Sequence, residues 1–142
     1  MDIEVAIREY VVGLPDVSAL VGTRGYQLVL PQECTYPAFR VQKLVEPVEY
    51  THDGPEALRR ADIQIDAVAQ EASGEDPYAN AIALANAIDA GLSGYIGPMG
   101  TSESPGLDVR GVFREDRKPF YESEELRLVR VLQLYTVWYR AT

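Results

Sequence analysis

The sequence predicts an α+β fold: a mainly antiparallel β-sheet of about five strands with helices packed on one face. Three stretches carry this prediction. Residues 61–69 alternate apolar and mostly polar side chains, which is typical of a strand with one buried face and one wet face. Residues 78–92 have the composition of a helix, and residues 126–139 alternate again over a longer stretch. A length of 142 residues fits one domain, spanning 1–142.

The helix predicted over 78–92 follows Asp76-Pro77, an N-cap residue and a proline suited to the first turn, and it ends at Ser93-Gly94. Only three of its positions are strongly polar: Asn80, Asn86 and Asp89. Two interpretations remain open. Alanines on the outer side would let a second surface approach closely, or alanine is present because it is the best helix former.

Shorter elements complete the fold. Apolar spacing and glycine or proline stops predict helices over 3–12 and 16–21. Further strands are predicted over 26–30, 38–45 and 107–113. The final strand, 126–139, would be about 46 Å long if straight, so we expect it to bend or to extend past its sheet.

Three segments have little periodicity. Residues 46–58 contain Pro47 and Asp53-Gly54-Pro55, which predicts an extended hairpin between two strands. Residues 94–106 are rich in glycine, serine and proline, and residues 114–125 are charged and contain a proline. Both are predicted to be loops.

The bulk composition limits the protein classes. A net charge of -9 argues against a surface that grips nucleic acid, although an acidic protein can stand beside DNA without binding it. Asp2 and Glu4 follow Met1 directly, so no signal peptide is expected, and no apolar run approaches the roughly 18 residues of a membrane span. A single cysteine, Cys34, excludes an internal disulfide and fits a reducing compartment.

Candidate catalytic residues are few. Asp62 and Asp66 share one strand face, but about 13 Å of strand separates them, beyond the roughly 5–9.5 Å between paired glycosidase carboxylates. His52 is the only histidine, and neither Cys34 nor the serines of 94–106 have a histidine nearby in sequence. No metal-ligand spacing or phosphate-binding motif is present. The sequence therefore predicts no enzyme and no catalytic, metal-binding or cofactor-binding residues.

Aromatic residues point instead to contact surfaces. Four of the nine tyrosines fall in predicted loops: Tyr36, Tyr50, Tyr95 and Tyr121. Tyrosine is favoured at protein interfaces because its ring is apolar and its tip polar. The alternative is that these are ordinary tyrosines at strand edges.

An ordered set of motifs runs over nearly the whole chain. After the N-terminal helix they are Ala19-Leu20-Val21-Gly22-Thr23-Arg24, 28–32, Tyr36-Pro37-Ala38-Phe39, Tyr50-Thr51-His52-Asp53-Gly54-Pro55, 60–67 and Thr136-Val137-Trp138-Tyr139. With these motifs the chain resembles the tail terminator (tail completion) proteins of long-tailed phages. The segments 94–106 and 114–125 match that family least.

The resemblance implies a structural virion protein at the tail–head junction, assembled in the cytoplasm of a host bacterium. Such a subunit forms a ring, typically a hexamer, on the head-proximal end of the tail tube. The ring stops tube polymerisation and offers a surface to a head-side connector, and DNA passes through its lumen without specific binding. The partners expected are other copies of the chain, the tube protein and the connector, with no cofactor and no membrane.

A closed ring needs two different complementary patches on each subunit. We expect these on the outer face of the 78–92 helix and on the 46–58 hairpin. The residues expected at subunit or tube contacts are Tyr50, Thr51, His52, Asp53, Ala83, Ala87, Tyr95 and Trp138.

Two other functions remain open. Another neck component, such as a head-closure or adaptor protein, could have the same small, acidic design. A small-ligand module or enzyme would need a pocket around His52 or around the Asp62/Asp66 face.

Overall fold

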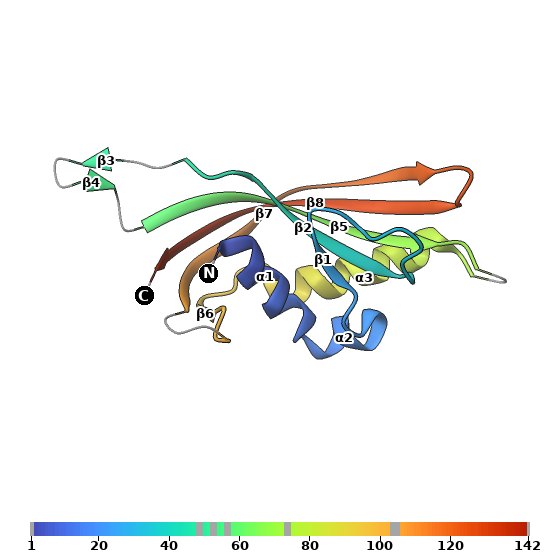
Figure 1. Cartoon of the computed structure of the whole chain (residues 1–142), viewed down its shortest axis with the longest axis horizontal. Helices are drawn as coiled ribbons and strands as arrows, with labels where there is room; N and C mark the ends of the chain where they lie inside the picture. Colours follow the sequence, from blue (N-terminus) through green and yellow to red (C-terminus); the bar gives the residue numbers. More distant parts are fainter. Residues whose placement is uncertain are drawn as a thin grey trace.

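The computed structural model describes residues 2–47, 50–51, 54–55, 58–72, 75–102 and 106–141 (Figure 1). Its helices are α1 (Ile3–Val12), α2 (Pro15–Val21) and α3 (Pro77–Leu92). Its strands are β1 (Gly25–Gln27), β2 (Ala38–Val45), β3 (Tyr50–Thr51), β4 (Gly54–Pro55), β5 (Leu58–Gln70), β6 (Gly97–Met99), β7 (Leu107–Ser123) and β8 (Leu128–Ala141).

Six of these strands form one sheet in the order β1-β2-β5-β8-β7-β6. Every pair is antiparallel except β1 with β2, which are parallel. Residues 28–37 connect these two strands. The small β3–β4 pair stands apart from this sheet, beyond the ends of β2 and β5 (Figure 1). The predicted α+β class and mainly antiparallel sheet are confirmed, with six strands rather than about five.

All three helices lie on one face of the sheet, as predicted (Figure 1). The alternation in β5 explains this arrangement, because its odd-numbered apolar residues from Ala61 to Ala69 are buried against the helices. α3 presents its own buried face to the same core: Ala81, Leu84, Ala85, Ile88 and Leu92. The opposite side, which we call the open face, carries the even-numbered residues of β5.

Polar contacts also tie α3 to the sheet. The buried amide of Gln133 donates to the Ala85 carbonyl (3.0 Å) and accepts from the Arg117 guanidinium (3.0 and 2.8 Å). Arg117 also donates to Asn86 (2.8 Å), and the Tyr135 hydroxyl lies 2.9 Å from Asp89. These contacts satisfy polar groups inside the core and fix which side of α3 faces outwards.

The predicted loop at 114–125 is wrong for most of its length. β7 continues to Ser123 and pairs with β8, so β7 and β8 form one long hairpin. Beyond Val109, β7 is an edge strand within the described chain, which is where a sheet tolerates Pro119. Three register shifts break its alternation, and this is why the sequence pattern concealed the strand.

The other predicted elements need smaller corrections. The segment 94–106, predicted as loop, contains the short strand β6, and the strand predicted over 26–30 is shortened to β1. Within the predicted 46–58 hairpin the structure describes β3 and β4, whose paired residues are Tyr50 with Pro55 and Thr51 with Gly54.

Candidate interaction surfaces

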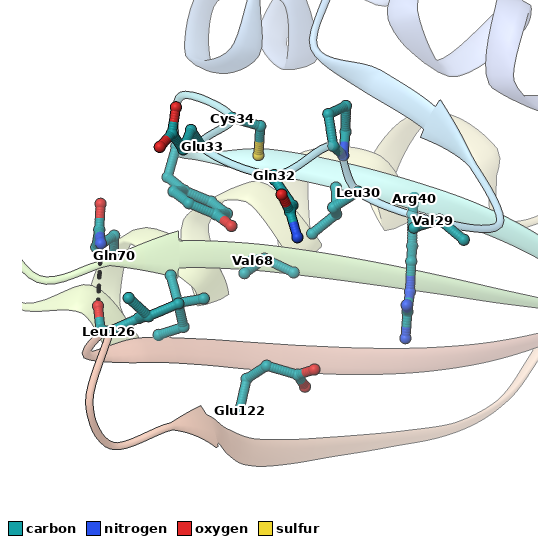
Figure 2. A pocket seen from close by; sticks show the side chains of 13 residues that line it. Val29, Leu30, Gln32, Glu33, Cys34, Arg40, Val68, Gln70, Glu122 and Leu126 are labelled. Carbon is teal, nitrogen blue, oxygen red and sulfur yellow. Dashed lines mark hydrogen bonds between the residues drawn. The ribbon is translucent and has the colours of Figure 1, made fainter.

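A hollow lies on the open face, where the loop after β1 crosses the sheet (Figure 2). Its volume is about 740 Å³. The loop contributes Val29, Leu30 and Cys34 to its wall, and the sheet contributes Arg40, Val68 and Leu128. The wall is therefore mixed, with apolar side chains beside three charged groups, Glu33, Arg40 and Glu122.

The hollow contains few reactive side chains among its described lining residues. Burial and a hydrogen bond with Cys34 raise the pKa of Tyr36 to about 12, so its hydroxyl stays protonated at neutral pH. His52, the only histidine, lies outside the described residues. Among the described residues no group of three or more His, Cys, Asp and Glu side chains is placed to hold a metal ion. The described lining of the hollow thus holds a thiol and two carboxylates but no histidine.

A buried carboxylate lies next to the hollow. Asp66 is fully buried in β5 and lies 2.6 Å from the Arg40 guanidinium and 3.5 Å from that of Arg130. The Gln64 amide also donates to it (3.1 and 3.0 Å). Arg130 continues the network to Glu122 at 2.9 Å. Asp66 therefore holds two arginines in place across β2, β5 and β8, which is a structural role.

Asp62 shares the open face with Asp66, as the sequence predicted, but its surroundings differ. Its side chain is 40% exposed and lies 3.9 Å from the Arg60 guanidinium. Its cross-strand partner on β8 is Thr136. Because Asp62 and Asp66 engage different arginines, the structure does not bring them together as a carboxylate pair.

The predicted contact residues on α3 differ in exposure. Ala83 is exposed on the outer side of the helix, together with Ala79 and Ala90. Ala87 is half-buried and packs against the core cluster. Three of the exposed positions of α3 are therefore alanines, and Ala83 is better suited than Ala87 to a test by substitution because it is exposed.

The remaining predicted contact residues are dispersed. Tyr95 is half-buried against Tyr10, with ring centroids 4.4 Å apart, and its hydroxyl donates to the Pro98 carbonyl (2.6 Å). Trp138 is half-buried in β8, opposite Arg60 on one side and Gly111 on the other. Tyr50 and Thr51 form β3. His52 and Asp53 lie outside the described residues.

A polar cluster stands where the chain leaves β2 towards β3. Glu46 accepts hydrogen bonds from the Tyr139 hydroxyl and from Lys43, the latter at 2.9 Å, and Lys43 also lies 3.7 Å from Glu4. Burial favours a raised pKa for Glu46, but the hydrogen bonds from Tyr139 and Lys43 outweigh burial and lower it. The cluster fixes the point from which the β3–β4 hairpin projects.

The lowered pKa of Glu46 predicts a pH dependence of stability. Its ionised form stabilises the fold above its unfolded pKa of about 4.3, and this stabilisation is lost as the pH falls through the lower folded pKa. We expect Glu46→Gln to lower the free energy of unfolding by about 1 kcal/mol at pH 7 and by less below pH 4. Urea unfolding of both proteins between pH 3 and 7 measures this difference. A difference that does not change with pH would contradict a role for the charge.

A surface that sequence reasoning missed lies at the turn of the β7–β8 hairpin. Tyr78, Phe120 and Tyr121 are all exposed, and with Pro119 and Val129 they line a shallow groove of about 230 Å³. The adjacent Phe120-Tyr121 pair was a usable signal, but the pair fell in a segment predicted to be a loop. The β-strand brings both rings next to the start of α3.

Comparison with known proteins supports the fold. No protein-family model matches the sequence, and no curated protein matches it. A solved structure described as the virion of a native gene transfer agent (GTA) particle contains a chain with a similar fold. The match has a TM-score of 0.70 at 21% identity, and it covers 97% of this chain and 94% of that chain. The two chains therefore share one fold over nearly their whole lengths.

Proposed function

We propose that this chain is a structural virion protein that forms a ring at the head-proximal end of a tail tube. The observation that supports this proposal most is the fold shared with a chain of a gene transfer agent virion, matched nearly end to end. The motif order that resembles phage tail terminators supports it independently. In this role the ring ends tube growth, offers a surface to the head-side connector and surrounds the DNA path.

The surfaces of the subunit suit such a role. The ring requires heterologous contacts, in which one patch on a subunit meets a different patch on its neighbour. The β3–β4 hairpin projects beyond the main sheet at one end of the molecule (Figure 1). The exposed alanines of α3, Ala79, Ala83 and Ala90, permit a close approach. The net charge of -9 would repel passing DNA.

Negative-stain microscopy combined with sedimentation velocity over a wide protein concentration range tests the ring directly. We expect annular particles with a central hole and a single fast-sedimenting species. A second assay adds the protein to growing tail tubes, whose length should stop increasing once their ends are occupied. A protein that neither closes into rings nor stops tube growth would refute the proposal.

A substitution on α3 tests the predicted contact. Ala83→Glu places a charge on the outer face and should abolish ring formation without unfolding the monomer, because Ala83 is exposed. Sedimentation velocity measures assembly, and circular dichroism checks the fold. Ala19→Glu, on an exposed position of α2, is the matched control and should leave the rings intact. Rings that persist in the Ala83 variant would remove α3 from the interface.

The same experiments separate the alternatives. A ring that binds the head-side connector but leaves tube growth unchanged would indicate another neck component. A small-ligand module would use the hollow of about 740 Å³ on the open face. Thermal-shift screening detects such a ligand, since binding to the folded state raises the melting temperature.

A further inference from the structure

Among the described residues, the two ends of the molecule carry opposite charge excesses. Figure 1 places the turn of the β7–β8 hairpin and the start of α3 at one end of the long axis, and the C-terminus and the β3–β4 hairpin at the other. We call these ends the tip and the arginine end. The tip comprises Glu71, Glu75, Asp76, Tyr78, Phe120, Tyr121, Glu122, Glu124, Glu125, Leu126, Arg127 and Arg130. The arginine end comprises Glu46, Leu58, Arg59, Arg60, Asp62, Asp108, Arg110, Trp138 and Arg140.

The tip is built as one surface. The Glu71 amide donates to the Arg127 carbonyl (3.0 Å), and Glu71 pairs with the Arg127 guanidinium, so the end of β5 is joined to the hairpin turn. Asp76 caps α3 through the Tyr78 amide (3.0 Å), which places Tyr78 beside Phe120 and Tyr121 in the groove. Six carboxylates surround these rings against two guanidiniums.

The arginine end is joined across three strands. Arg140 of β8 lies between Leu58 of β5 and Asp108 of β7, and Trp138 lies opposite Arg60. Four guanidiniums meet three carboxylates in this described surface. Asp62 pairs with Arg60 (3.9 Å), Asp108 pairs with Arg110 (3.3 Å), and Glu46 lies near Arg59. Leu58, which is exposed, and the half-buried Trp138 give this end an apolar part as well.

We infer that the tip of one copy docks on the arginine end of the next copy. The partner is a second copy because both complementary surfaces belong to this chain and lie at opposite ends of it. Repetition of such a head-to-tail contact closes a ring when the rotation between neighbours permits it. The chain's own Arg130 and Arg127 lie 4.9 Å from the Phe120 ring centroid and 5.8 Å from the Tyr121 ring centroid, yet both rings and Tyr78 stay exposed. In the contact, the arginines and Trp138 of the next copy would cover the surface that remains, a pairing that protein interfaces favour. The inference rests on the proposed ring and names the surfaces that hold it together.

Charge reversal at each end tests the contact. Glu124→Lys with Glu125→Lys reverses two exposed turn residues of the tip, and Arg110→Glu with Arg140→Glu reverses two exposed residues of the arginine end. Each double variant alone should need at least about tenfold more protein to assemble, because the substituted residues then face charges of their own sign and the attraction between the two ends is lost. Sedimentation velocity measures the shift, and circular dichroism confirms folding.

Recovery of ring formation when the two reversed surfaces are combined tests whether they contact each other. A chain that carries all four substitutions should form rings again, and a 1:1 mixture of the two double variants should do so with alternating subunits. Asp2→Lys with Asp16→Lys changes the net charge as much as the tip variant does, at exposed positions near α1 and α2, and should assemble as the unmodified protein does.

The outcomes separate this contact from the proposed function. If the double variants form normal rings, or the four-substitution chain fails to recover, the contact is wrong while the ring stands. If a reversed tip leaves rings intact but abolishes capping of tail tubes, the tip belongs to the tube protein and this inference is overturned. If the unmodified protein neither forms rings nor caps tubes, the proposed function fails and the contact with it.

Discussion

Asp66→Ala is expected to lower the free energy of unfolding by about 3 kcal/mol. The substitution removes a fully buried carboxylate and leaves Arg40 and Arg130 facing each other without their shared partner. Removal of one partner from a buried ion pair typically costs about 3–5 kcal/mol. Both arginines retain some access to water, which favours the lower end of that range.

Asp62→Ala is the matched control on the same strand and the same face. Because Asp62 is 40% exposed and lies 3.9 Å from its arginine, its removal should change stability by less than about 1 kcal/mol. Urea unfolding followed by far-ultraviolet circular dichroism measures both variants. Equal losses of stability at the two positions would show that burial of Asp66 is not what matters.

Phe39→Ala should destabilise the fold by about 3–5 kcal/mol. Phe39 is fully buried in β2, and its ring packs against the backbone of Gly25, where an added Cβ would lie 2.4 Å from the ring. Truncation of the ring leaves a cavity between β1, β2 and α1 that the surrounding residues can fill only in part. The same urea titration measures the loss.

Phe113→Ala provides the comparison for Phe39. Its side chain is 54% exposed on β7, so the same truncation removes little buried surface and should cost less than about 0.5 kcal/mol. The expected contrast between two identical substitutions isolates the effect of burial. A loss at Phe39 as small as that at Phe113 would contradict the packing described for β1 and β2.

The two clearest sequence patterns, those of residues 61–69 and 78–92, correctly predicted β5 and α3, which pack together at the centre of the fold. β5 has apolar residues at the odd positions from Ala61 to Ala69, because that face packs on helices, and mostly polar residues at the even positions between them. α3 has an N-cap and a proline that mark its start. The alternation predicted one helix-covered face, and the structure confirms it. Sequence reasoning succeeded where burial is regular and failed where it is not.

β7 illustrates the failure. Each register shift moves the following residues to the other face, so no simple period survives over its 17 residues. Arg114 and Arg117 also occupy the helix-covered side, where they reach Asp89 and Asn86 with their polar ends. Long charged side chains can cover an apolar surface in this way. In a sequence, however, a run of such residues suggests a solvent-exposed loop.

Contact surfaces were harder to predict than strands. The exposed outer face of α3 agrees with its many alanines. The tip could be predicted only if residues 120–121 were known to lie beside residue 78. That proximity depends on the β7–β8 pairing over a long hairpin. Because the strand was missed, the aromatic groove and the charge contrast between the two ends were missed with it.

The irregular outer edge of β7 also affects how readily further chains can add to the sheet and form fibrils. A long, straight, unpaired strand invites another chain to add to it, and such addition has no natural stopping point. In β7 the register shifts bend the edge, Pro119 removes a donor, and a row of charged residues flanks it. The edge is therefore a poor seed for fibrils, even at high protein concentration.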